Sequence, residues 1–241
     1  MNGFNKYQYE DMVVRRDDPY ANAKYQIILG YLKHEKSLKI LNAGCGSGEL
    51  SFLLARAGHE VLGIDPAREY IDLAKKLVPK ELLNFCDFQI SSIENFQTSE
   101  KFDAVIATDV LEHIKDDEAA ARRLADFVRP GGHFIVTVPA MQSLYGFHDE
   151  ELGHFRRYGA GQLKKIINKT NLISIKKIRY FGFTLIPVCV LYSRILRRSY
   201  PVAASGRSGT LRAVLLKMLL TLDRNLPMPL GTSLILFGRR R

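Results

Sequence analysis

Residues 40–48 read Ile-Leu-Asn-Ala-Gly-Cys-Gly-Ser-Gly, an apolar β-like run that leads through a glycine-rich turn into an amphipathic stretch. Glycines suit such a turn because they let the backbone bend tightly and approach a ligand closely, with the amide groups of the next helix facing it. The dinucleotide-binding fingerprint has glycines at its first, third and sixth positions, whereas the sixth position here is Glu49. Because a carboxylate would repel a diphosphate, the turn fits a pyrophosphate-binding loop badly.

A second chemical signal is Asp65, which ends the apolar run Val61-Leu62-Gly63-Ile64, 21 residues after Gly44. At this spacing an acidic side chain reaches the hydroxyl groups of a ribose. The alternative is that Asp65 caps a helix that begins after Pro66. Together with the glycine loop, the sequence favours the ribose role.

The order of the segments predicts an α/β fold. Short apolar runs alternate with longer amphipathic ones between residues 37 and 140, which is typical of βαβ units and a mostly parallel sheet. We expect strands at 38–41, 61–64, 85–90, 104–108 and 134–138, and helices at 50–57, 70–78 and 119–128. A helix at 161–171, a strand at 172–180 and a final strand at 231–237 follow.

Five motifs occur in order within residues 38–140: the loop at 42–48, Gly63-Ile64-Asp65, Phe102-Asp103-Ala104-Val105, Asp109-Val110-Leu111-Glu112-His113, and Pro130-Gly131-Gly132. With these motifs the chain resembles the Rossmann-like, class I S-adenosylmethionine-dependent methyltransferases. The resemblance implies a mostly parallel seven-stranded sheet with helices on both faces, an antiparallel last strand and an apolar helical insertion before that strand. It implies S-adenosylmethionine as the cofactor.

The resemblance also implies a donor site, carried over residue by residue. The glycine loop would line the donor, Asp65 would hold the ribose diol, and Pro66 and Ala67 would pack beside the adenosine. Asn42 stands where many members have Asp or Glu, so it offers an amide without the charge. Glu112 and His113 belong to a family signature that we interpret as structural. The expected donor-binding residues are Asn42, Gly44, Cys45, Gly46, Gly48, Asp65, Pro66, Ser92, Ile93, Thr108 and Asp109.

Residues 148–158 concentrate two histidines, three carboxylates, two arginines and a tyrosine directly after the fifth expected strand. Loops at this end of an α/β sheet hold substrates. Methyl transfer to oxygen or nitrogen needs an in-line acceptor and often a base, for which histidine is suited. The alternative is a salt-bridged cap in which Arg156 and Arg157 neutralise Asp149 and Glu150. We expect no metal, because His148 and His154 are six residues apart in a loop. The catalytic candidates are His148, His154, Asp149 and Tyr158.

The last third of the chain is basic and contains two apolar segments, 181–192 and 213–222. Residues 160–241 carry 16 Lys and Arg against one acidic residue, whereas residues 1–159 carry 19 against 24. Neither segment reaches the roughly 20 residues that span a bilayer. With Arg194, Arg197 and Arg198 expected on one helical face, we interpret the pair as interfacial helices at an anionic membrane surface. Packing against each other or within a homodimer is the alternative. Nucleic acid is a weaker candidate, because exposed aromatics do not alternate with the charges.

We expect one domain over residues 1–241: an N-terminal helical lid at 1–36, a donor-binding core at 37–140, an acceptor loop at 141–160 and the apolar basic insertion at 181–224, with any linker at 203–209. Three distant cysteines and no apolar leader favour a cytoplasmic protein, peripheral on the inner membrane face. The expected activity is methyl transfer to an oxygen or nitrogen of a small-molecule or lipid-linked acceptor. The alternatives are an NAD-dependent or sugar-nucleotide enzyme and a non-catalytic membrane-surface scaffold. More loosely, residues 148–158 resemble methyltransferases of cell-envelope polysaccharide synthesis.

Overall fold

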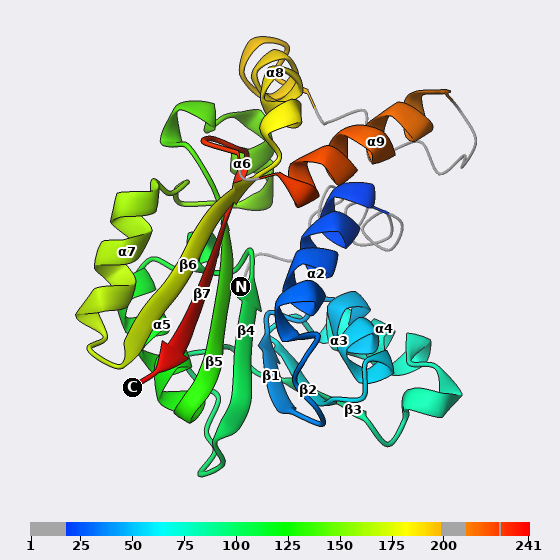
Figure 1. Cartoon of the computed structure of the whole chain (residues 1–241), viewed down its shortest axis with the longest axis vertical. Coiled ribbons are helices and arrows are strands. Elements are labelled where there is room, and N and C mark those ends of the chain that lie inside the picture. Colours follow the sequence, from blue (N-terminus) through cyan, green and yellow to red (C-terminus); the bar gives the residue numbers. More distant parts are fainter. Residues whose placement is uncertain (1–17, 199–210, 227) are drawn as a thin grey trace.

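The computed structural model describes residues 18–198, 211–226 and 228–241. Within these residues, seven strands form one sheet in the order β3-β2-β1-β4-β5-β7-β6 (Figure 1). Only β7 runs antiparallel to its neighbours β5 and β6, which confirms the expected mostly parallel sheet with an antiparallel last strand. The strands are β1 (Lys39–Ala43), β2 (Glu60–Asp65), β3 (Cys86–Ile90), β4 (Phe102–Thr108), β5 (Val128–Pro139), β6 (Ile173–Phe181) and β7 (Ser233–Arg240).

Helices cover both faces of the sheet, as expected for its near-continuous apolar strands. One buried cluster joins the sheet to three helices, α2 (Pro19–Leu32), α3 (Glu49–Arg56) and α4 (Arg68–Leu77). A second cluster joins the opposite face to α5 (Asp117–Phe127) and α7 (Ala160–Lys169). The strands and helices lie within three residues of the predicted ranges, except that β5 begins at Val128, six residues before the predicted start at 134.

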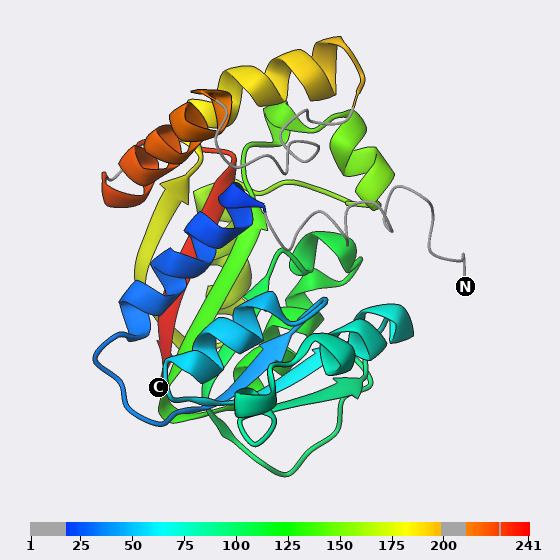
Figure 2. The ribbon, with the colours of Figure 1, turned by 90° about the vertical axis from the view of Figure 1, so that its right-hand side faces the viewer.

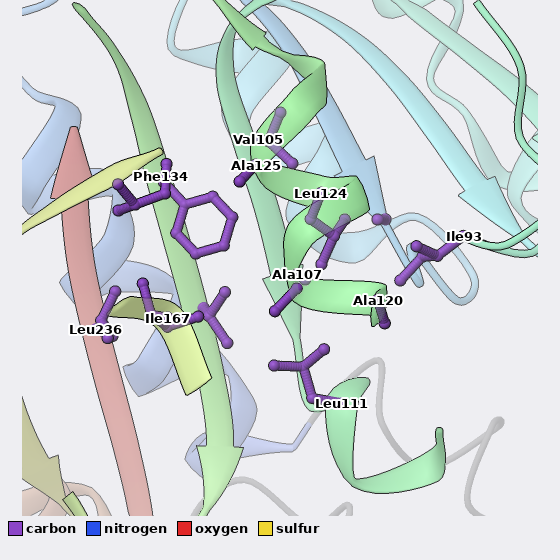
Figure 3. Packing of buried hydrophobic residues seen from close by; sticks show 14 of the residues in the cluster. Ile93, Val105, Ala107, Leu111, Ala120, Leu124, Ala125, Phe134, Ile167 and Leu236 are labelled. Carbon is purple, nitrogen blue, oxygen red and sulfur yellow. The ribbon is translucent and has the colours of Figure 1, made fainter. Parts of the chain in front are cut away.

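The second cluster shows why α5 sits so close to the sheet. Figure 3 shows Leu124 and Ala125 of α5 beside Val105 and Ala107 of β4, and all four are buried. Alanine side chains on this face let the helix axis approach the strands closely, and the leucine fills the remaining space. This packing holds the turn after β4, which contributes to the functional site, against a rigid support.

Apart from α7, the helices that follow β5 lie beyond the carboxyl ends of the parallel strands (Figures 1 and 2). The chain leaves β6 at Phe181 and returns at Ser233, so this segment is an insertion before the last strand, as expected. Its turn is tight, because a Cβ on Gly231 would lie 2.4 Å from the carbonyl oxygen of Phe181. The insertion contains η4 (Phe183–Leu185), α8 (Ile186–Cys189), the π-helical η5 (Val190–Ile195) and α9 (Leu211–Asn225).

Four details differ from the sequence expectation or lie outside the described residues. The segment 141–160 is not a plain loop, because it contains η3 (Gln142–Leu144) and α6 (Phe147–Leu152). Arg197 has a φ of +48° and follows the end of η5, so Arg194, Arg197 and Arg198 do not share one helical face. The linker expected at 203–209 lies outside the described residues. Of the expected lid, residues 1–17 also lie outside them, and α2 with the segment after it is described.

Candidate active site

A cavity of about 700 Å³ opens at the carboxyl ends of β1, β2 and β4. Its walls come from α2, the glycine loop, the turns after β2, β3 and β4, the helix α6 and the insertion. In α/β sheets ligands bind at this edge, so the fold alone marks the cavity as the candidate site. The cavity brings the expected donor loop and the expected acceptor loop into one space.

The glycine loop is folded back onto β2. The backbone N–H groups of Gly44 and Cys45 both donate to the carbonyl oxygen of Ile64, at 2.8 and 3.0 Å. Gly44 and Gly46 have φ angles of +70° and +53°, which side chains rarely adopt. An ideal Cβ on Gly44 would lie 2.3 Å from Cγ2 of Val110, whereas one on Gly46 would meet no atom within 4 Å. Gly46 thus borders open space inside the cavity.

Two residues of the expected donor set do not line the cavity. Gly48 lies beneath the loop, where a Cβ would come within 2.8 Å of the Phe52 ring. Asn42 is 1% exposed, and its amide nitrogen donates to the hydroxyl oxygen of Ser51 on α3 at 2.9 Å. Its amide oxygen is buried and has no hydrogen-bond partner among the described residues. Both residues therefore support the conformation of the glycine loop without facing the cavity.

Asp65 supports two turns and also lines the cavity. Its Oδ1 accepts from the backbone N–H of Ala67 at 3.0 Å, which supports the turn into α4. Its Oδ2 accepts from the backbone N–H of Gly46 at 3.1 Å, which fixes the glycine loop. The carboxylate also lines the cavity, as do Pro66, Ser92 and Ile93.

The end of β4 carries a charge pair that sequence analysis missed. Asp109 has a φ of +54°, and its Oδ1 accepts from the Thr137 hydroxyl at 3.0 Å. Its other oxygen pairs with the ammonium group of Lys24 on α2. Burial by itself would lower the pKa of Lys24, but the charge of Asp109 outweighs it and raises this pKa. A lysine in an amphipathic helix is normally solvated, so no local pattern singled out Lys24.

The expected acceptor loop at 141–160, called the acceptor segment from here on, contains a buried carboxylate that binds two other side chains of the segment. Asp149 is 0% exposed. Its carboxylate is hydrogen-bonded to Nδ1 of His154 at 2.8 Å and accepts from Nε of Arg157 at 2.8 and 2.9 Å. Burial would raise the pKa of Asp149, but the hydrogen bond from His154 and the charge of Arg157 hold it below its usual value. His148, His154 and Arg157 line the cavity, whereas Asp149 lies behind them.

The ion pairs of this segment differ in part from the expected ones, in which Arg156 and Arg157 neutralise Asp149 and Glu150. Arg157 does pair with Asp149, but Arg156 pairs with Asp117 at 2.7 Å and Glu150 pairs with Arg197 at 2.7 Å. Tyr158, which we expected to be catalytic, is 0% exposed and does not line the cavity. Its hydroxyl donates to Asp117 Oδ2 at 2.9 Å, and burial raises its pKa. This position fits a structural role and not contact with substrate.

One group has the residue types of a metal site. Glu112, His113 and His154 bring one ligand atom each within 4.8 Å of one another. The two imidazole rings pack edge to face, with centroids 4.6 Å apart and planes at 82°. A shared ion needs both ring nitrogens directed at one centre in open space. Sequence analysis considered His148 with His154 and missed this grouping, because Glu112 and His113 come from a different turn.

The family model described as "Methyltransferase domain" matches residues 41–136. These residues contain the glycine loop, Asp65 and the turn after β4. The matched part of the chain, residues 41–136, is a methyltransferase domain of the S-adenosylmethionine-dependent, class I type. The dinucleotide-dependent alternative therefore has no support from the family match.

Curated methyltransferases give the most specific similarities. The human mitochondrial ubiquinone biosynthesis O-methyltransferase is 34% identical over 146 residues, covering 57% of this chain and 40% of that protein. The ubiquinone biosynthesis O-methyltransferase of Methylocella silvestris is 42% identical over 98 residues, covering 40% of this chain and 38% of that protein. The chain thus spans about two fifths of the length of these relatives.

Solved methyltransferase structures support the fold over nearly the whole chain. An S-adenosylmethionine-dependent methyltransferase from Mesorhizobium loti has a TM-score of 0.64 at 16% identity, covering 90% of this chain and 98% of its own. The N-methyltransferase NodS of Bradyrhizobium japonicum, in complex with S-adenosylhomocysteine, has a TM-score of 0.62 at 17% identity, covering 98% of both chains. The [4+2]-cyclase SpnF also has a TM-score of 0.64, at 18% identity, covering 91% of this chain and 81% of its own. The fold by itself therefore does not fix the reaction.

Proposed function

We propose that this methyltransferase transfers the methyl group of S-adenosylmethionine to an oxygen of an amphiphilic, lipid-linked acceptor at a membrane surface. The carrying observation is the single cavity that joins the glycine loop and Asp65 to the histidines of the acceptor segment. The names of the curated relatives, ubiquinone biosynthesis O-methyltransferases, favour oxygen over nitrogen.

The residues around the glycine loop fit the donor. Asp65 offers a carboxylate to the ribose hydroxyls, and Gly46 leaves open space where a side chain would stand. Ser92, Ile93, Thr108 and Asp109 line the cavity as well, and the family resemblance implies that the first two contact the adenine and the last two lie beside the sulfonium. Asn42, Cys45 and Gly48 support the loop in this proposal. Of these, Asn42 and Gly48 act without lining the cavity.

The donor supplies an already activated methyl group, so the protein has to position the acceptor in line and remove a proton from it. His148 and His154 are the bases that line the cavity on the acceptor side. Glu112 and His113 form the floor beside them. The chain thus provides groups for both tasks in one cavity.

The insertion supports an amphiphilic acceptor. Leu185, Val188 and Cys189 give the cavity an apolar wall. Elsewhere the insertion exposes large apolar side chains on η5 and α9, including Leu191, Ile195, Leu215 and Met218, which are 44 to 66% exposed. Arg194, Arg197 and Lys217 are exposed among them. Apolar side chains mixed with cations suit the interface of an anionic bilayer. No helix within the described ranges is long and apolar enough to cross a membrane.

The test of activity uses methyl-labelled S-adenosylmethionine with a whole-cell extract, followed by separation of lipid, nucleic acid, protein and small-molecule fractions. We expect label in the organic phase for the wild type and none for Gly46→Arg, whose side chain would fill the donor cavity. Gly58→Arg is the matched control, because Gly58 also has a left-handed φ, +92°, and open space around it, but lies outside the cavity. Label only in an aqueous fraction would reject a lipid-linked acceptor. Transfer by Gly46→Arg would reject the donor loop, and no wild-type transfer would reject the activity.

The test of the membrane surface is cosedimentation with vesicles of phosphatidylglycerol and phosphatidylcholine. We expect wild-type binding, and its loss in the double variant Ile195→Asp/Met218→Asp, whose positions are 66% and 65% exposed. Leu83→Asp is the control, because Leu83 is 57% exposed and lies outside the insertion. A wild type that ignores the vesicles and forms a dimer by light scattering would show that the apolar face packs on a second subunit instead.

A further inference from the structure

We infer that Nε2 of His154 is the atom that accepts the proton of the acceptor hydroxyl, and that Asp149 and Arg157 are positioning residues for this imidazole. The inference rests on the proposed function and deepens it, because it chooses one base and gives its tautomer. It begins from the buried group around Asp149, in which three residues of the segment 149–157 converge.

The carboxylate of Asp149 is held in its ionised form. Beside the two contacts from Arg157, its Oδ2 accepts from the backbone N–H of Gly146 at 3.0 Å. Every one of these partners is a donor, and hydrogen bonding to the charged form of a carboxylate stabilises that form. With the carboxyl side chain fully buried, this group forms one rigid unit with α6.

An ionised carboxylate accepts hydrogen bonds and donates none. Nδ1 of His154, 2.8 Å from Asp149 Oδ1, must therefore carry the proton in this pair. In the neutral imidazole the lone pair then lies on Nε2. The His154 side chain is 7% exposed and lines the cavity, and Nε2 is the ring nitrogen that Asp149 does not occupy.

Side chains from two elements face the ring. Asp149 faces it from α6, and Glu112 and His113 face it from η2 (Leu111–His113), with ligand atoms of His154 and these two residues within 4.8 Å. Arg157 is the positively charged residue near the ring, and it forms an ion pair with Asp149. The Tyr145 hydroxyl donates to the backbone oxygen of His154 at 2.7 Å and fixes the main chain.

The step balances without a further reactant. The acceptor oxygen forms a bond to the methyl carbon while the bond between that carbon and sulfur breaks. The electron pair of the broken carbon–sulfur bond stays on sulfur. The O–H bond of the acceptor breaks, and its proton goes to Nε2 of His154. The imidazolium returns the proton to water after the products leave.

The first test needs no acceptor. Long-range ¹H–¹⁵N correlation spectra of the full chain at neutral pH report which nitrogen of each histidine is protonated. We expect His154 as the Nδ1-protonated tautomer in the wild type, and loss of that preference in Asp149→Asn. The inference is overturned if His154 is protonated at Nε2, or is protonated at both nitrogens at neutral pH.

The second test measures methyl transfer into the extract fraction that accepts label. Because general base catalysis contributes about 10²–10⁴-fold, we expect His154→Gln to lower kcat by about 100-fold or more and to abolish the rise of the rate with pH. Titration calorimetry with S-adenosylhomocysteine should give the same affinity as in the wild type. His34→Gln, an exposed histidine outside the cavity, is the control. His154→Gln leaves the Asp149–Arg157 pair intact, so it remains informative if Asp149→Asn does not fold.

Two results would overturn the inference while leaving the proposed function standing. One is a His154→Gln enzyme with wild-type kcat, or a loss of the pH-dependent limb in His148→Gln instead. The other is a wild type that loses activity in chelator and regains it with a divalent cation that His154→Gln no longer binds, because His154 would then be a metal ligand. A wild type without any transfer would instead reject the proposed function.

Discussion

Lys24 and Asp109 form an ion pair that joins the N-terminal helix α2 to the end of β4 inside the cavity. Lys24 is 4% exposed, and its ammonium group also lies 5.1 Å from the centroid of the Tyr20 ring. The pair places a helix that precedes the glycine-rich core against the end of β4. The proposed donor site thus includes a residue outside the family match, which begins at residue 41.

Replacing Lys24 by Met should destabilise the fold, because it leaves a carboxylate in a largely buried position without its cation. Breaking one partner of a buried pair costs about 3–5 kcal/mol, and we expect the lower end because the Asp109 side chain is 24% exposed. Urea unfolding measures the change. Lys33→Met, on an exposed position just after α2, should be neutral. Equal stability of the two variants would contradict the role of the pair.

The same pair should give an alkaline signature. The pKa of Lys24 is raised in the folded state from its ordinary value of 10.5. A raised pKa contributes stability that is fully present below the unfolded value and is lost as the pH rises through the folded value. The stability difference between the wild type and Lys24→Met should therefore be constant from neutral pH to about pH 9 and shrink at higher pH. A difference that grows with pH would refute this assignment.

Asp65→Asn should weaken donor binding more than it weakens the fold. The carboxylate accepts two backbone hydrogen bonds and lines the cavity. Hydrogen bonds to charged groups contribute about 1.5–3 kcal/mol, so we expect about a 10- to 100-fold loss of affinity for S-adenosylhomocysteine. Titration calorimetry measures it. Asp87→Asn on the exposed side of β3 is the control, and a matching loss there would argue against a specific role of Asp65.

Tyr158→Phe separates structure from catalysis in the acceptor segment. It removes the buried hydrogen bond to Asp117, whose carboxylate keeps its pair with Arg156. We expect a loss of about 1–2 kcal/mol of unfolding free energy in urea. The rate of methyl transfer at saturating donor should be unchanged below the unfolding transition. A large drop in kcat with unchanged stability would restore Tyr158 as a catalytic candidate.

The two faces of α9 should respond differently to truncation. Leu220 is 2% exposed and packs in the cluster that joins the sheet to α2 and α3, whereas Met218 is 65% exposed. Leu220→Ala should cost about 2–5 kcal/mol of unfolding free energy, while Met218→Ala should change it by no more than about 0.5 kcal/mol. Chemical unfolding of both variants tests this. A strong effect of Met218→Ala without lipid would indicate that this side chain packs within the protein or on a second subunit.

The sequence by itself determined the sheet and the donor loop. Strand and helix periods are local properties, so apolar runs such as 61–64 and the stop at Gly58 predicted the elements, whereas Pro130 lies within β5. The glycine loop and Asp65 were also readable, because backbone turns that need a left-handed φ and a carboxylate at a strand end leave marks at fixed spacing. The antiparallel last strand followed from the resemblance that these motifs carry.

Only the tertiary structure decided which polar side chains meet. Lys24 and Asp109 are 85 residues apart, and Glu112 meets His154 from a different turn, so neither contact leaves a local pattern. The acceptor segment contains several acidic and basic residues, so the sequence allows several ion pairs. Which of them form depends on which side chains are buried. The buried Asp149 carboxylate is hydrogen-bonded to His154 and pairs with Arg157. Tyr158 is buried in the core, and its hydroxyl donates to Asp117. The physical reason is that a buried charge or hydroxyl needs a partner, and the fold, not the neighbouring sequence, supplies it.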